Sequence, residues 1–227
     1  MMEGNLPPSL SFAFLGAFLL VDALFVFFAR LSYKKKKGQA FSFLNGFPFE
    51  LMMDKTIKVF FAIACFFDLF ANVHFFVTFS HSPRGLGFLA FALGLCVVIR
   101  TLLLMFMVVL PASYNKQHIL VVSLYFGFAA LLGLLGGFYL FRLSQGGLYP
   151  ATLVFGILSM MLGVLNLLIM ANPRFASWAK LASEEEGGEV VVKRPAFFLL
   201  AASEWLGILL SVLISVFLAL GVAFLAL

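Results

Sequence analysis

The sequence predicts an all-α polytopic membrane protein, a bundle of six transmembrane helices with a short interfacial amphipathic helix between the fifth and the sixth. Of its 227 residues, 63% are hydrophobic and 11% are charged, and the mean hydropathy is +1.12. A soluble domain carries about 25% charged residues. Six segments are apolar over the roughly 20 residues that cross a bilayer core. We therefore expect a single transmembrane domain over residues 1–227, without a separate soluble catalytic domain.

The six expected spans follow one another in order. They cover approximately residues 10–31, 57–79, 86–110, 119–141, 151–171 and 196–227. Pro111 ends the third span, and Asn172 with Pro173 ends the fifth, because proline breaks a continuing helix. Most connections are short, so neighbouring spans are expected to be antiparallel.

The two longer connections differ in character. Residues 32–56 contain four consecutive lysines, Lys34, Lys35, Lys36 and Lys37. In the second long connection, Phe175 and Trp178 recur at helical spacing beside basic residues. This pattern predicts an interfacial helix over residues 174–183, anchored by these two rings and, at the start of the last span, by Trp205.

Basic residues predict the orientation of the chain. The first, third and fifth connections carry most of the lysine and arginine, whereas the opposite side carries Arg84 and Arg142. The positive-inside rule then places those odd connections on the cytoplasmic or matrix side and both termini on the other side. The net charge of +5 is part of this topology signal, so we expect no nucleic-acid binding.

Small and polar residues form stripes along four of the expected helices, which is typical of contact between membrane helices. Glycines dominate two stripes and are expected at helix-packing positions: Gly127, Gly133, Gly137, Gly156 and Gly163. The other two stripes include Asp68 and Asn72 in the second span, and Glu204 and Ser211 in the last. A minority interpretation is that two or three stripes line a polar pathway.

Three charged residues lie near the middle of the expected spans. Asp22, Asp68 and Arg100 fall within a turn or two of the same depth when the helices alternate in direction. A charge at the bilayer centre costs roughly 2.5–3.5 kcal/mol on insertion scales and normally finds a partner. We expect Arg100 to bridge both aspartates, with Asn72 completing the hydrogen bonds of this intramembrane charge cluster.

A second candidate polar site comprises Glu204, Asn166 and His74. Glu204 is buried if the last span enters the membrane at Ala196, but the neighbouring Trp205 favours a position at the headgroups. His74 lies off the Asp68 face near the end of its helix, where an interfacial hydrogen bond is the more ordinary role.

No motif for a cofactor or for catalysis is found in the sequence. No lysine lies at a span centre for a retinal Schiff base, and two histidines at matched depth for haem are lacking. Cys65 and Cys96 lie in apolar runs and are expected to be free thiols. We therefore predict no metal, no cofactor and no enzymatic activity, with bound lipids as the expected small-molecule partners.

The preferred functional hypothesis is a non-catalytic accessory subunit of a larger membrane protein complex, whose partners are other membrane subunits and lipids. A bioenergetic complex of the mitochondrial inner membrane is one setting. The alternative is a small secondary transporter or channel that uses Asp22, Asp68 and Arg100 as a midplane ion or proton site. Against the alternative, no glycine or proline break lies beside either aspartate. A lipid-modifying enzyme using Asp68 and His74 ranks last, because that spacing puts them on different helix faces.

Overall fold

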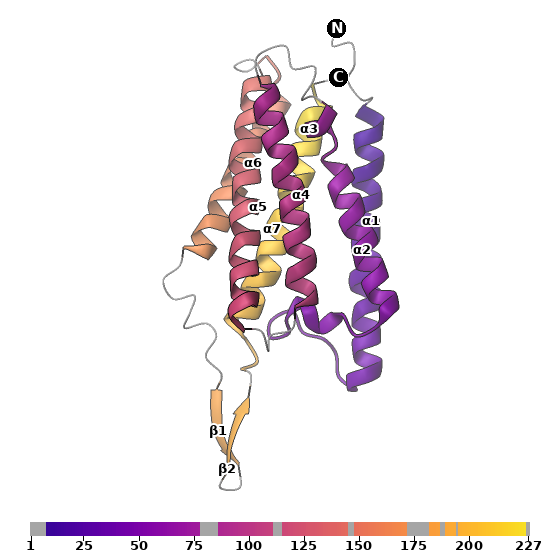
Figure 1. Ribbon diagram of the computed structural model, residues 1–227, viewed down its shortest axis with the longest axis vertical. Coiled ribbons are helices and arrows are strands. Elements are labelled where there is room, and N and C mark those ends of the chain that lie inside the picture. Colours follow the sequence, from indigo (N-terminus) through magenta and orange to yellow (C-terminus); the bar gives the residue numbers. More distant parts are fainter. Residues whose placement is uncertain are drawn as a thin grey trace.

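The computed structural model describes residues 8–77, 86–110, 115–144, 148–171, 182–186, 189–193 and 195–225. These residues form a bundle of long helices and one short β-hairpin (Figure 1). In chain order the elements are α1 (Pro8–Lys37), the 3-10 helix η1 (Pro48–Leu51), α2 (Lys55–Ala71), α3 (His74–Val77), α4 (Gly87–Val109), α5 (Asn115–Leu143), α6 (Pro150–Met170), β1 (Ala182–Glu186), β2 (Glu189–Lys193) and α7 (Leu199–Ala223).

Five of these helices are long and apolar enough to cross a membrane. The segments that qualify are Phe12–Lys37, Gly87–Val109, Gln117–Leu143, Pro150–Met170 and Leu199–Ala223. The chain therefore has the composition of a multi-pass membrane protein. The remaining expected span, 57–79, is the second in chain order and is not one continuous helix: α2 ends at Ala71, and α3 begins at His74.

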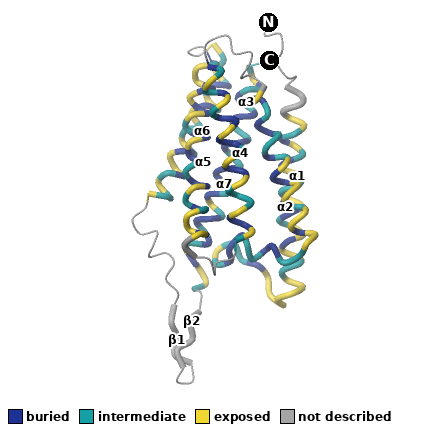
Figure 2. Tube along the Cα trace, in the orientation of Figure 1, coloured by how far each residue is buried: buried dark blue, intermediate teal, exposed yellow. Residues whose placement is uncertain are grey.

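The distribution of buried and exposed residue types is the reverse of that in a soluble protein. Exposed residues along the helices are mostly large and apolar, such as Phe88, which is 80% exposed, whereas Asp68 and Arg100 are 3% and 1% exposed. Figure 2 shows the buried positions gathered on the inner faces of the helices. Such a surface suits a lipid solvent, in which apolar side chains face outward and charged ones face the bundle interior.

The helices form two packed groups. The pair α1 and α2 lies together along one side of the bundle, and α4, α5, α6 and α7 pack against one another beside it (Figure 1). α1 starts and α7 ends at one end of the bundle, which we call the terminal end. The opposite end, where α1 ends and α2 begins, we call the loop end. Contacts of α1 with α7, and of α2 with α4 and α7, join the two groups.

Glycines bring α5 and α6 into close contact. A Cβ atom added to Gly133 would lie 2.8 Å from the carbonyl oxygen of Ser159 and 2.9 Å from Cα of Gly163. The reverse contact is equally tight, since a Cβ on Gly163 would lie 2.9 Å from the carbonyl oxygen of Ala130. The two backbones therefore touch through these residues, as small residues permit in membrane helix pairs.

The loop end is closed by residues 41–53, which we call the capping loop. After α1 the chain turns at Gly38, whose positive φ of 72° is the left-handed conformation that ends many helices. Phe41, Phe47 and Leu51 of the capping loop are buried. The loop is fastened to α7, because Nε1 of Trp205 donates a hydrogen bond to the carbonyl oxygen of Gly46 at 2.8 Å.

Polar contacts join α1 to α2 beside the capping loop. Lys36 forms an ion pair with Asp54, and the Ser32 hydroxyl donates a hydrogen bond to the same carboxylate. Lys36 also donates to the carbonyl oxygen of Met53 at 3.0 Å. These hydrogen bonds to Lys36 and Ser32 lower the pKa of the Asp54 carboxyl below its ordinary value of 3.8.

Several expected boundaries differ from the structure. α1 continues through the four lysines to Lys37, because cations are favourable beside the carbonyl groups of a helix C-terminus. α7 spans 25 residues, shorter than the expected 196–227. Most of the expected interfacial helix, with Phe175 and Trp178, lies outside the described residues. Its last two residues, Ala182 and Ser183, belong to strand β1, where Ser183 pairs with Val192 of β2.

Replacing Gly133 with alanine is expected to destabilise the bundle, because the added methyl group meets backbone atoms of α6 that cannot move alone. Gly127→Ala on the same helix is the matched control, since its Cβ would meet only the sulfur of Met170 at 3.8 Å. Alanine is intrinsically favoured over glycine in a helix by about 1 kcal/mol. Thermal midpoints in detergent should therefore fall for Gly133→Ala and stay or rise for Gly127→Ala; equal midpoints would contradict the close contact.

The link between Asp54 and α1 should depend on acidity. Because the pKa of Asp54 is lowered in the folded chain, its contribution to stability is present above about pH 4 and is lost as the pH falls through the folded-state value. The protection factors of amide hydrogens in the first turn of α2, which correct for the intrinsic slowing of exchange in acid, should therefore fall on acidification. Asp54→Asn should remove this acid-dependent step; a step that persists in the variant would assign it to another group.

Candidate functional site

Asp68 and Arg100 form an ion pair inside the bundle. Asp68 lies on the inner face of α2, and Arg100 extends from the middle of α4, where Nη2 donates to Oδ2 of Asp68. Their side chains are 5% and 2% exposed. Ions removed from water are stable only when paired and hydrogen-bonded. This pair therefore joins the α1–α2 group to the α4–α7 group.

Hydroxyl groups satisfy the remaining atoms of the pair. Nη1 of Arg100 donates to Oγ of Ser215 at 2.8 Å and to Oγ of Ser211 at 3.1 Å, both on α7. The Ser215 hydroxyl in turn donates to Oδ1 of Asp68 at 3.3 Å, and Thr101 donates to Oδ2 at 3.2 Å. One network thus connects α2, α4 and α7, and the serine stripe of α7 supplies two of its three hydroxyls.

Asn72 joins this network at the point where the second expected span breaks. Its Nδ2 donates to the backbone carbonyl oxygen of Asp68 at 3.1 Å and to Oγ of Ser215 at 3.3 Å. α2 ends one residue earlier, and the chain turns before α3 begins at His74. The helix is therefore interrupted one turn beyond Asp68, although neither glycine nor proline is present there.

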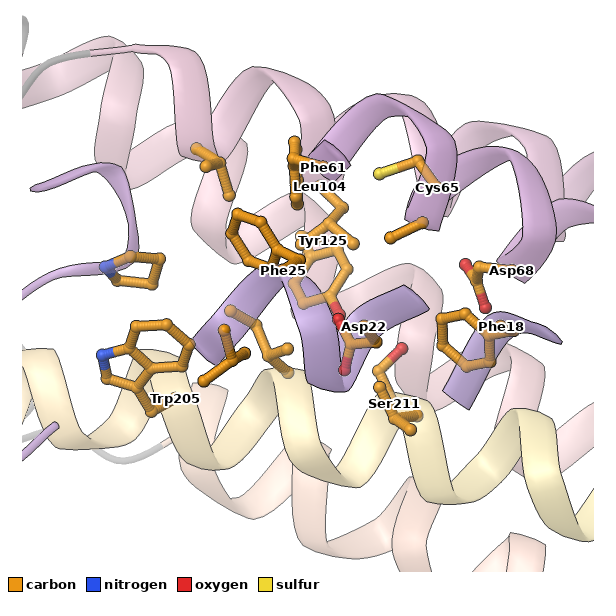
Figure 3. A pocket seen from close by; sticks show the side chains of 16 residues that line it. Phe18, Asp22, Phe25, Phe61, Cys65, Asp68, Leu104, Tyr125, Trp205 and Ser211 are labelled. Carbon is orange, nitrogen blue, oxygen red and sulfur yellow. The ribbon is translucent and has the colours of Figure 1, made fainter. Parts of the chain in front are cut away.

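Asp22 contributes to a cavity, and Arg100 does not bridge it to Asp68 as expected. The cavity has a volume of about 60 Å³ and lies between the two helix groups. Figure 3 shows the side chains of Asp22, Tyr125 and Ser211 directed into one space, with Asp68 farther along the same wall. Arg100 is turned instead toward Asp68 and the α7 serines, because their oxygen atoms already accept its donors. The expected three-residue cluster thus divides into an ion pair and a separate carboxylate.

Glu204 is buried inside the protein at the loop end. It is 1% exposed, and its Oε1 lies 3.2 Å from Nε2 of His118 at the start of α5. Phe47 and Phe49 of the capping loop place their rings edge-on to the imidazole of His118. The capping loop therefore shields Glu204 at this end of α7, and the headgroup depth inferred from Trp205 stays a prediction.

The second candidate polar site is not assembled. Glu204 pairs with His118, whereas His74 is buried in α3 toward the terminal end. Asn166 is fully buried on α6, and its Nδ2 donates to the carbonyl oxygen of Leu162 one turn earlier, at 3.5 Å. These three residues belong to separate surroundings, and within the described part of the chain no group of three or more His, Cys, Asp or Glu could hold a metal ion.

The sequence did not indicate three of the residues that lie at these sites. Tyr125 lines the cavity, Thr101 binds Asp68, and His118 binds Glu204. His118 and Tyr125 are seven residues apart in α5, which places them on one helix face. That spacing was a usable signal, but nothing in the sequence indicates which face of α5 meets α7 and the capping loop.

Removing one member of the ion pair should lower the stability of the protein more than removing both. Arg100→Leu leaves the Asp68 carboxylate buried without a counter-ion, and loss of one partner of a buried pair costs about 3–5 kcal/mol. The double variant Asp68→Leu with Arg100→Leu leaves no buried charge and should recover a large part of this loss. Membrane abundance and thermal midpoint in detergent measure both; a double variant less stable than Arg100→Leu would contradict the account.

Comparison with known proteins adds no assignment to this geometry. The chain matches no protein-family model, no curated protein and no solved structure. The functional argument therefore rests on the ion pair, the hydroxyl network around it, and the cavity that contains Asp22.

Proposed function

We propose that this chain is a small membrane transport protein that carries a monovalent cation or a proton through the space between its two helix groups. The observation that carries the proposal is the cavity with Asp22 in its wall, next to the buried Asp68–Arg100 pair. Asp22 has no ion pair or hydrogen bond to another described residue. An ionisable residue within a membrane bundle is by default a functional candidate.

The two aspartates would have different roles. Asp68 is fixed by Arg100 and by hydroxyls from α4 and α7, so its charge is already matched. Asp22 is the carboxylate left over, and it faces a space large enough for several water molecules, each needing at least about 10–15 Å³ of such volume. Asp22 would bind the transported cation, while the Asp68–Arg100 pair would set the local charge and hold the helices in register.

The packing of the helices suits alternating exposure of such a site. Tight backbone contact joins α5 to α6, while α1 and α2 meet the remaining helices through side chains of an apolar cluster, around the cavity, and through the polar network. Movement of the α1–α2 group against the rest would open the cavity toward one end and then the other, as in transporters that rock one bundle against another. The interruption at Asn72 is the kind of helix break found beside midplane binding sites.

The proposal includes six membrane crossings. Together α2 and α3 extend from Lys55 to Val77, which is long enough to span a bilayer core despite the break between them. The lysines at the loop end then favour a cytoplasmic or matrix position for that end, with both termini on the opposite side. The expected interfacial helix, shortened so that it ends before β1, would lie at the same membrane surface as the loop end.

A second candidate is an accessory subunit of a larger membrane complex. It is favoured by the saturation of the Asp68–Arg100 network, in which the carboxylate and guanidinium groups are bonded to residues of α4 and α7 within this chain. On this view the network only holds the bundle together, and the exposed aromatic faces meet other subunits and lipids. A bioenergetic assembly such as one of the mitochondrial inner membrane remains the setting proposed for that role.

Flux through the isolated chain separates the two candidates. The purified protein reconstituted in liposomes should dissipate an imposed cation or proton gradient, and Asp22→Asn should reduce the rate to that of protein-free liposomes while keeping the protein abundant. Asp54→Asn is the matched control, since Asp54 lies at the loop end and is bound to Lys36. Equal flux in both variants would argue against Asp22 as the carrier.

The absence of flux in the unmodified chain would overturn the transport proposal. Native electrophoresis of gently solubilised membranes would then test the second candidate. Co-migration with a fixed set of partner subunits, lost in Arg100→Leu, would support the accessory role, and migration of the chain alone would contradict it.

A further inference from the structure

The cavity that contains Asp22 has an unusual lining for an inorganic ion site. Five aromatic side chains from four helices surround it: Phe18, Phe25, Phe61, Tyr125 and Trp205. Most other lining residues are aliphatic, and the polar atoms gather at one end near Asp22 and Ser211 (Figure 3). A ligand of this cavity would therefore contact one negative group and mostly ring and alkyl surfaces.

The charge balance of the cavity calls for one positive charge. Asp22 and Asp68 together carry two negative charges when ionised, and Arg100 supplies one positive charge to Asp68. No described cationic side chain lines the cavity. A monovalent cation beside Asp22 would complete the balance, and its pairing would be strengthened by the low polarity of the surrounding side chains.

The available side-chain oxygens are too few for a calcium or magnesium ion. Calcium takes about 6–8 oxygens, and magnesium requires an octahedral set. Both oxygens of Asp68 already accept hydrogen bonds, and the Ser211 hydroxyl accepts one from Arg100. The Tyr125 hydroxyl is hydrogen-bonded to Ser211, so among the side chains that line the cavity only the Asp22 carboxylate is left to coordinate an ion. An organic ammonium needs no such shell, because aromatic faces attract it through cation–π interactions.

We propose that this cavity is a binding site for a small organic monocation of the alkylammonium class, with Asp22 as its counter-ion. Phe25, Phe61 and Trp205 would supply ring surfaces to its alkyl groups. The cavity has room for about four water molecules, which corresponds to a cation of about five heavy atoms. The inference rests on the proposed transport function, since it names the class of cation that this same site would carry.

Binding of tetramethylammonium tests the inference, because this cation has a permanent charge and fits the cavity. Trp205 lines the site, and Trp178 is the other tryptophan of the chain. A Trp178→Phe background therefore leaves Trp205 as the single tryptophan, whose emission is followed. In lipid nanodiscs, tetramethylammonium chloride should change this emission in a saturable manner, and sodium chloride at equal ionic strength should not.

Paired variants locate the binding site. Asp22→Asn should weaken tetramethylammonium binding by at least about tenfold, as expected for loss of a counter-ion in an apolar site, whereas Asp54→Asn should not change it. Phe61→Leu should weaken binding by about threefold through loss of one ring. Phe66→Leu on the same helix is its control, since Phe66 is 53% exposed and lies outside the cavity lining.

The outcomes of binding and flux are separable. Saturable binding that is weakened by Asp22→Asn and Phe61→Leu supports the inference. An equal fluorescence response to sodium chloride, or binding that is unchanged in both variants, overturns it.

If Asp22-dependent proton or sodium flux is measured without tetramethylammonium binding, the transport function stands and the organic cation is rejected. If the cation binds and no flux is found, the site stands and the transport function is rejected. Phe61→Leu decides the case in which Asp22→Asn does not fold.

Discussion

The buried ion pair between Asp68 and Arg100 is the interaction on which the rest of the structure depends. Neither charge could stay inside an apolar bundle alone, so each requires the other and a set of hydroxyl donors and acceptors. Ser215 meets this need from a third helix, bonding both members of the pair. The position of α7 relative to α2 and α4 is therefore fixed by hydrogen bonding as well as by shape.

The contact between α5 and α6 differs in kind from the contact between the two helix groups, and this difference creates the cavity. Glycines let the backbones of α5 and α6 touch, which leaves no space between them. Between α1–α2 and the other helices, large rings and a polar network meet instead, and they do not fill the volume beside Asp22. A carboxylate next to an incompletely filled, aromatic-walled space is what distinguishes this bundle from one built only for packing.

The loop end shows how a connection can complete a membrane site. The capping loop buries Phe41 and Phe47, accepts a hydrogen bond from Trp205, and covers the pair formed by Glu204 and His118. Pro48 at the start of η1 and Trp205 both line the cavity, so this loop also forms its wall toward the loop end. Access to the cavity from that end would require the capping loop to move.

The sequence by itself determined the membrane class, the positions of five long apolar helices, and four of the five expected glycine contacts, Gly127 being the exception, because hydrophobicity, length and helical periodicity are local properties. It also marked Asp22, Asp68 and Arg100, since charges in apolar runs are conspicuous. Only the tertiary structure decided which aspartate Arg100 pairs with, that Glu204 meets His118, and that α2 ends beside Asp68. Those outcomes depend on how helices rotate and on where a distant loop folds back, and such long-range packing leaves no pattern within any single segment.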